Sequence, residues 1–215
     1  MAAVAVLLTS APCSAPRTPW QVYGFRDGAW RLLPFFRPNL DLACSKSRDD
    51  LSSNEPETRQ AQEAGWHVTA SILADVTGDA QAERVLVVWR RWSDWPIQQW
   101  TSAPSPIAGW HDAAGDSCHL VVLDGRDGRQ VWAGSALPAP LVGLEAGDVD
   151  GDGRNEVATL EGDYVTGRYG PATHIDIWKW NGFGFTLEWR SPPGAMHQLC
   201  LTDLDGDSIL EVAFR

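Results

Sequence analysis

Short apolar runs separated by turn residues recur along the chain. Three pairs of runs are joined by tight turns, namely 22–25 with 30–33, 121–123 with 130–132, and 175–180 with 185–189. The third pair is joined by Asn181-Gly182, and Asn-Gly between alternating runs is the strongest short-range hairpin signal. The pattern predicts antiparallel β-hairpins.

A second pattern is an acidic nonapeptide that occurs three times without gaps, at 75–83, 148–156 and 203–211. Each copy reads D-x-[D/T]-G-D-x-x-x-E, and each lies between two apolar, β-rich runs. Successive copies start 73 and 55 residues apart. A loop, a strand, a hairpin and a further strand make up one unit, which is the content of a propeller blade. We therefore predict an all-β chain of about three four-stranded antiparallel blades, forming part of a propeller or an arc.

Two segments interrupt the repeat. Residues 45–65 are polar and predict a surface loop or a short helix, and residues 90–117 are predicted to be a Trp- and Pro-rich insertion. Neither predicts a separate domain, so residues 16–215 form one repeat array. Closed propellers usually have four to eight blades. The chain is therefore either a piece of a longer propeller, or strand 212–214 joins the N-terminal hairpin in a shared blade of an open arc or an oligomer.

Charge adds candidate chemistry to this picture. The formal net charge is −11, which argues against a general nucleic-acid surface. Eleven acids lie in the three loops, where positions 1, 3, 5 and 9 and the carbonyl of position 7 can converge on one ion. Hard oxygen ligands in this number suit Ca²⁺, with Mg²⁺ second, and none of them is soft enough for zinc or copper. The predicted ligands are Asp75, Thr77, Asp79, Gln81 and Glu83; Asp148, Asp150, Asp152, Arg154 and Glu156; and Asp203, Asp205, Asp207, Ile209 and Glu211.

Two other interpretations of the loops stay open. An EF-hand or dockerin loop needs a glutamate at position 12 and flanking helices, but that position holds Leu86, Thr159 and Phe214 between β-rich runs. Acidic surface turns without a metal are the second alternative, above all for the first loop, where Thr77 and Ala80 weaken the site. Glycine at position 4 of every loop predicts a bend with positive φ.

Loops of the form Asp148-x-Asp-Gly-Asp-Gly-x-x-Glu156 between strands resemble the FG-GAP and VCBS repeats of integrin-α-type β-propellers. The resemblance covers roughly residues 20–215. It implies Ca²⁺ held by positions 1, 3, 5 and 9 of each loop, with Thr77 as the departure, in a family that is commonly extracellular and adhesive and rarely catalytic. Residues 119–132 are also similar to one strand pair of quinoprotein-type propellers, which supports a propeller but not a quinone cofactor.

No catalytic constellation stands out. The five histidines are scattered, and HExxH, GxSxG and P-loop motifs are absent. Asp112 and Asp116 near His111 indicate a solvated turn, with a small polar site as the alternative. Loop carboxylates acting as a hydrolase acid and base are the remaining enzyme alternative, but three near-copies suit structural metal better. We therefore expect no enzyme.

Tryptophans supply the candidate ligand surface. Trp92, Trp95, Trp100 and Trp110 of the insertion, if exposed, are flat platforms for a sugar ring or a partner protein. The alternative is that they pack over the blade. Trp178, Trp180 and Trp189 lie in predicted strands and are expected in the core.

The N-terminus and the cysteines bear on location. Residues 1–15 resemble the tail of a secretory signal or, loosely, a lipoprotein signal with a lipid anchor on Cys13. No apolar run reaches the ~18 residues of a membrane span. Cys44, Cys118 and Cys200 form no CxxC pair, so both a disulfide and buried thiols stay open.

The expected function follows from the calcium argument. Calcium modules that bind at ~10⁻⁴ to 10⁻³ M suit the extracellular space or the cell surface. We expect a non-catalytic extracellular module for adhesion to a protein or glycan. The alternative is a purely structural, calcium-stapled domain of a longer chain.

Overall fold

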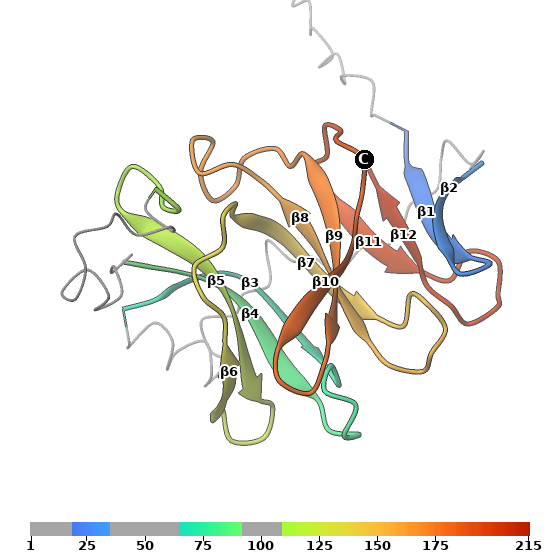
Figure 1. Ribbon diagram of the computed structural model, residues 1–215, viewed down its shortest axis with the longest axis horizontal. Coiled ribbons are helices and arrows are strands. Elements are labelled where there is room, and N and C mark those ends of the chain that lie inside the picture. Colours follow the sequence, from blue (N-terminus) through green and yellow to red (C-terminus); the bar gives the residue numbers. More distant parts are fainter. Residues whose placement is uncertain (1–18, 35–64, 92–108) are drawn as a thin grey trace, which may run out of the picture.

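The computed structural model describes residues 19–34, 65–91 and 109–215, and every helix or strand assigned in these ranges is a β-strand. The strands form three antiparallel sheets of four (Figure 1), which confirms the predicted all-β, blade-like fold. The first sheet contains β3 (His67–Ala74), β4 (Glu83–Arg91), β5 (Asp116–Asp124) and β6 (Gln130–Ala133), in that order. The second contains β7 (Leu141–Gly147), β8 (Glu156–Glu161), β9 (His174–Trp180) and β10 (Phe185–Arg190). The third has the order β11 (Leu199–Thr202), β12 (Glu211–Phe214), β1 (Gln21–Arg26) and β2 (Ala29–Leu33).

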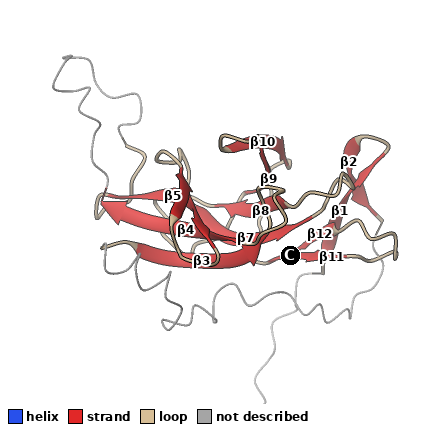
Figure 2. Ribbon diagram, turned by 90° about the horizontal axis from the view of Figure 1, so that it is seen from below, coloured by secondary structure: helices blue, strands red, loops and turns tan. Residues whose placement is uncertain are grey.

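Both ends of the described chain meet in the third sheet. Strand β1 pairs antiparallel with β12, with Gln21 opposite Phe214 and Tyr23 opposite Val212. A blade shared by the N-terminal hairpin and strand 212–214, one of the two alternatives drawn from the sequence, is thus observed. Strand β7 contacts both β3 and β11, so the three innermost strands lie side by side and the sheets follow one another in an arc (Figure 2).

The predicted insertion at 90–117 is too long at both ends. Arg91 still belongs to β4 and Asp116 already belongs to β5, where the two residues face each other in the β-ladder. The ladder extends because each added pair gives further backbone N–H and C=O groups a hydrogen-bond partner. Residues 35–64 and 92–108, which hold most of the segment 45–65 and of the insertion, lie outside the described residues.

Among the described residues, the two larger clusters of buried hydrophobic side chains fill the gaps between neighbouring sheets. Between the first and second sheets lie, among others, Val87, Trp89 and Leu144. Between the second and third sheets lie, among others, Leu160 and Ile177. Each fully buried side chain of this size stabilises the fold by about 1.5–3 kcal/mol relative to exposure. Because the second sheet is covered on both faces, all six residues of β8 are buried.

The predicted polar–apolar alternation of 175–180 is only half right. Ile175 and Ile177 face the third sheet, whereas Trp178 and Trp180 pack toward the first. Asp176 lies between the two isoleucines, is fully buried and accepts hydrogen bonds from Arg190. The strand therefore carries apolar side chains on both faces, and the expected packing of Trp178, Trp180 and Trp189 is confirmed.

A buried histidine connects β5 to the segment that follows β6. His119 is 5% exposed, its Nδ1 lies 3.0 Å from Gly134 O, and its Nε2 lies 2.9 Å from Ser117 Oγ. Burial lowers the pKa of His119 to about 4. Because the folded state holds the neutral ring, this contribution to stability is complete above pH ~6.5 and is lost as the pH falls toward 4.

We predict that His119→Asn removes this pH dependence. The asparagine amide can reach the Gly134 carbonyl but does not titrate. Between pH 8 and pH 5 the wild-type protein should lose about 2 kcal/mol more unfolding free energy than the variant. Urea unfolding at the two pH values measures the difference. An equal loss in both proteins would show that His119 is not held neutral.

Candidate metal centres

The three acidic loops occupy equivalent places in the three sheets. Each joins the innermost strand to the second strand, namely β3 to β4, β7 to β8 and β11 to β12. They follow one another along the lower right of Figure 1, in green, gold and red-orange. The predicted placement of each acidic loop between two strands is therefore confirmed.

One set of hydrogen bonds shapes all three loops. In the second loop, Asp148 accepts the backbone N–H groups of Gly151 (2.7 Å) and Gly153 (2.9 Å), and Asp152 accepts that of Arg154 (2.9 Å). The same bonds recur at the equivalent positions of the first and third loops. The aspartates at positions 1 and 5 thus bend the backbone as well as supplying charge.

Two residues of each loop have left-handed backbone conformations. Position 4 is a glycine in every loop, with φ between 78° and 85°, as predicted. Position 6 is also left-handed, at Ala80 (φ 65°), Gly153 (φ 83°) and Ser208 (φ 71°). The sequence did not indicate the left-handed conformation of position 6, because two of its three residues carry a Cβ, which disfavours that conformation.

The glutamate at position 9 is buried in every loop. Glu83, Glu156 and Glu211 are 5%, 1% and 1% exposed. In each, Oε2 accepts the backbone N–H of position 2, at 3.0, 3.2 and 2.8 Å. Burial raises the pKa of Glu156 to about 7 and also raises the pKa of Glu83. Burial disfavours the ionised form, so a cation near the second carboxylate oxygen would stabilise it.

Carboxylates converge in each loop. One oxygen from each of three acids lies within 4.8 Å of the other two, in the groups Asp75, Asp79 and Glu83; Asp148, Asp150 and Glu156; and Asp203, Asp205 and Glu211. Ca²⁺ sits about 2.3–2.6 Å from its oxygen ligands, so oxygens this far apart can contact one ion. The residues therefore fit a divalent ion.

The remaining predicted ligands are placed differently. Asp152 and Asp207 stand outside these groups, and Thr77 Oγ1 donates instead to Glu83 Oε1 (3.3 Å). The use of the carbonyls of Gln81, Arg154 and Ile209 stays a prediction. The side chains of Arg154 and Ile209 lie on the neighbouring loop, since a Cβ at Gly78 would be 3.7 Å from Arg154 Nε and one at Gly151 would be 2.7 Å from Ile209 Cδ1.

Hydrogen bonds link each loop to the preceding one. Asn155 Nδ2, from position 8 of the second loop, donates to Asp75 O of the first (2.9 Å). Leu210 N, from position 8 of the third loop, donates to Asp148 O of the second (2.9 Å). The acceptor is the position 1 carbonyl in both cases, so the loops form a continuous chain across the three sheets.

Sequence reasoning missed the cations that face the loops. Lys179 Nζ lies 2.6 Å from Asp150 Oδ2 and 2.7 Å from Asp152 Oδ2 in the second loop. Arg26 Nη2 lies 2.7 Å from Asp205 Oδ2 in the third loop and also bonds Glu211. Both come from the third strand of their sheet. The predicted hairpins did not contain this signal, because Lys179 approaches the loop through the pairing of β9 with β8, in which Trp178 lies opposite Val157.

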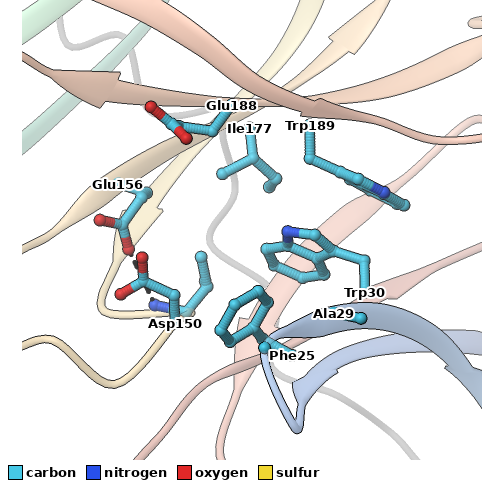
Figure 3. Close-up of a pocket in the computed structure, with 10 residues that line it drawn as sticks. Phe25, Ala29, Trp30, Asp150, Glu156, Ile177, Glu188 and Trp189 are labelled. Atoms are coloured by element: carbon cyan, nitrogen blue, oxygen red, sulfur yellow. Dashed lines mark hydrogen bonds between the residues drawn. The ribbon is translucent and has the colours of Figure 1, made fainter.

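A pocket of about 540 Å³ opens beside the second loop, between the second and third sheets. Figure 3 shows Asp150 and Glu156 on one side of it and the rings of Phe25 and Trp30 on the other. Trp30 stacks on Trp189, with ring centroids 4.8 Å apart. The pocket thus combines an aromatic wall with the acidic loop.

Other predicted features have mixed outcomes. Trp92, Trp95, Trp100 and Cys13 lie outside the described residues, whereas Trp110 is half-buried just before β5. Asp112 lies in the turn before β5 and Asp116 is the first residue of β5, and both pair with Arg168. Cys118 and Cys200 are buried thiols. Over the described ranges, no helix long and apolar enough to cross a membrane occurs.

No family model, curated protein or solved structure matches the chain. The resemblance to FG-GAP and VCBS repeats therefore stays a prediction.

We predict that Asn155→Ala weakens the contact between the first two loops. Removing the bond to Asp75 O should cost about 1 kcal/mol and lower the melting temperature by about 2–4 °C in a chain of this size. Differential scanning calorimetry measures the change. Gln81→Ala removes an amide that bonds only within its own loop, to Asp79 at 3.3 Å, and is the matched control. Equal shifts in the two variants would contradict a special role for the link between loops.

Proposed function

We propose that this protein is a non-catalytic, calcium-binding module of the FG-GAP/VCBS propeller type that acts outside the cell in adhesion or in binding a protein or glycan. The observation that carries the calcium proposal is the repeated burial of a glutamate against two aspartates in the three loops. One such cluster is common on protein surfaces. Three at the same point of three sheets, each with the same backbone hydrogen bonds, favour a shared ligand.

The location of the loops supports a stabilising role for the ion. Ion binding would hold together the positions 1 and 9 that border each loop, and the bonds from Asn155 and Leu210 connect each loop to the preceding one. An ion that fixes one loop would therefore also support the contact between neighbouring sheets. Calcium is preferred to magnesium because the donors are oxygens in a flexible loop rather than a rigid octahedron.

The ligand-binding part of the proposal rests on the pocket beside the second loop. Phe25 and Trp30 offer apolar ring surface, and the exposed Glu188 offers a hydrogen-bond acceptor at the rim. Aromatic rings next to polar groups suit a sugar ring or an aliphatic side chain of a partner protein. A purely structural, calcium-stapled domain is the alternative, and loss of ligand binding in Trp30→Ala on a glycan array would distinguish the two.

We predict that calcium raises the melting temperature of metal-stripped protein. At an ion concentration 100 times the dissociation constant, one site adds about 2.7 kcal/mol, which corresponds to about 5–10 °C in a chain of this size. Adding chelator should reverse the shift, and Mg²⁺ at the same concentration should produce a smaller one. Melting curves in chelator, CaCl₂ and MgCl₂ provide the measurement.

A pair of glutamate variants controls this experiment. Glu156→Gln should remove one calcium ion from the stoichiometry and reduce the shift, because it removes the buried carboxylate of the second loop. Glu188→Gln carries the same change of charge in the neighbouring pocket and should keep the wild-type shift. Identical melts of the wild-type protein in chelator and calcium, with no heat of binding, would refute the calcium proposal.

A further inference from the structure

Two cationic side chains lie at the centres of two of the three acidic loops. Lys179 Nζ is within 3.1 Å of carboxylate oxygens of Asp150, Asp152 and Glu156. Glu156 Oε1 is buried and has no hydrogen-bond partner in the described structure, so this ammonium is the group that offsets its charge. Lys179 therefore lies where the carboxylates of the second loop converge.

Arg26 takes the corresponding place in the third loop. Its Nη2 lies 2.7 Å from Asp205 and 3.8 Å from Asp207, and it also bonds the buried Glu211. In the strand register the residue opposite Glu211 is Gly24, so the longer arginine two residues further along β1 reaches the loop. In both sheets the cation thus comes from the third strand, counted from the innermost one, but from a different position along that strand.

No such cation faces the first loop among residues 19–34, 65–91 and 109–215. The residue opposite Glu83 is Asp124, whose carboxylate pairs with Arg126 and Arg129. From the described part of the chain, no lysine or arginine forms an ion pair with Asp75, Asp79 or Glu83. Its third position is also Thr77 rather than an aspartate, so the loop with the smallest acidic charge is the one without an internal cation.

We propose that Lys179 and Arg26 are internal counter-cations, which hold the second and third loops closed without metal and which a divalent ion must displace. This inference rests on the proposed calcium binding. An ion bound to these carboxylates would sit about 2.3–2.6 Å from their oxygens, the space that the ammonium and guanidinium groups now fill. Two cations cannot share this space, so each internal counter-cation lowers the apparent calcium affinity of its own loop.

The pocket beside the second loop provides the route for this exchange. Asp150 and Glu156 line it, so a hydrated ion can approach them from the side that faces Phe25 and Trp30 (Figure 3). Lys179 lies on the same face of β9 as Ile177, which also lines the pocket. The Lys179 side chain is only 22% exposed while it is paired, and solvent next to the loop would hydrate the ammonium once it is released.

Calorimetric titration of CaCl₂ into metal-stripped protein tests the proposal. Lys179→Met should bind calcium at the second loop about tenfold more tightly than the wild-type protein and should melt at a lower temperature in chelator. Lys179→Arg, which keeps the charge, should behave as wild type. Arg129→Met removes the same charge from an exposed arginine that pairs with the half-buried Asp124 (3.7 Å), which Arg126 also neutralises, and is the control for net charge. Arg26→Gln tests the third loop independently, should Lys179→Met fold poorly.

The outcomes separate this proposal from the calcium proposal itself. Tighter binding in Lys179→Met or Arg26→Gln, with Arg129→Met unchanged, supports displacement, even if the wild-type protein binds too weakly to detect. Normal wild-type binding with unchanged affinity in both loop variants overturns the displacement alone. No binding in any protein overturns both proposals. An equal gain in calcium affinity in Arg129→Met would assign the effect to net charge and would also overturn the displacement proposal.

Discussion

A glutamate buried at the first residue of β4, β8 and β12 is the constraint on which the loops depend. One oxygen of each carboxylate accepts a backbone N–H group, and each glutamate has an oxygen within 4.8 Å of oxygens of two further acids. Two carboxylates about 4 Å apart repel each other by roughly 4 kcal/mol at an effective dielectric near 20. The loop geometry does not relieve this repulsion, because the aspartate hydrogen bonds fix the backbone around it. A cation would therefore stabilise each site, and among the described residues one faces the carboxylates of the second loop and one those of the third.

The fold and the loops were predictable where their signals are local. Turn residues such as Asn181-Gly182 fix the hairpins, and nine consecutive residues fix each acidic loop. The cations were not predictable from spacing, because Lys179 reaches its loop only through the register of β9 on β8. Buried polar residues also disturbed the hydrophobic pattern. Asp176 is buried and bonded to Arg190, so its polar side chain makes β9 resemble a strand with only one buried face. Ala80 and Ser208 adopt left-handed backbone conformations, but neither is a glycine, so the sequence carried no signal of this conformation.

The loops are not independent of one another. Asn155 of the second loop bonds the backbone of the first, and Leu210 of the third bonds that of the second. Groups that share hydrogen bonds respond together to a change at one of them. A cation that orders the second loop would therefore also position Asp148 O, which accepts from Leu210 N, and Asn155 Nδ2, which donates to Asp75 O. The same chain of contacts follows the innermost strands β3, β7 and β11, so loop order and sheet packing support each other.

The third loop raises the question of whether releasing Arg26 would open the shared sheet. Arg26 is 179 positions from Asp205, so this ion pair joins the two ends of the described chain. It is not the main link, however. Strand β1 remains paired with β12 along the backbone, Tyr23 stacks on Phe214 at 5.3 Å, and Trp30 stacks on Trp189. These contacts involve no charge and lie outside the acidic loop, so an ion can replace the guanidinium while the sheet stays intact. Displacement at the third loop would therefore be a local exchange of cations, as we propose for the second.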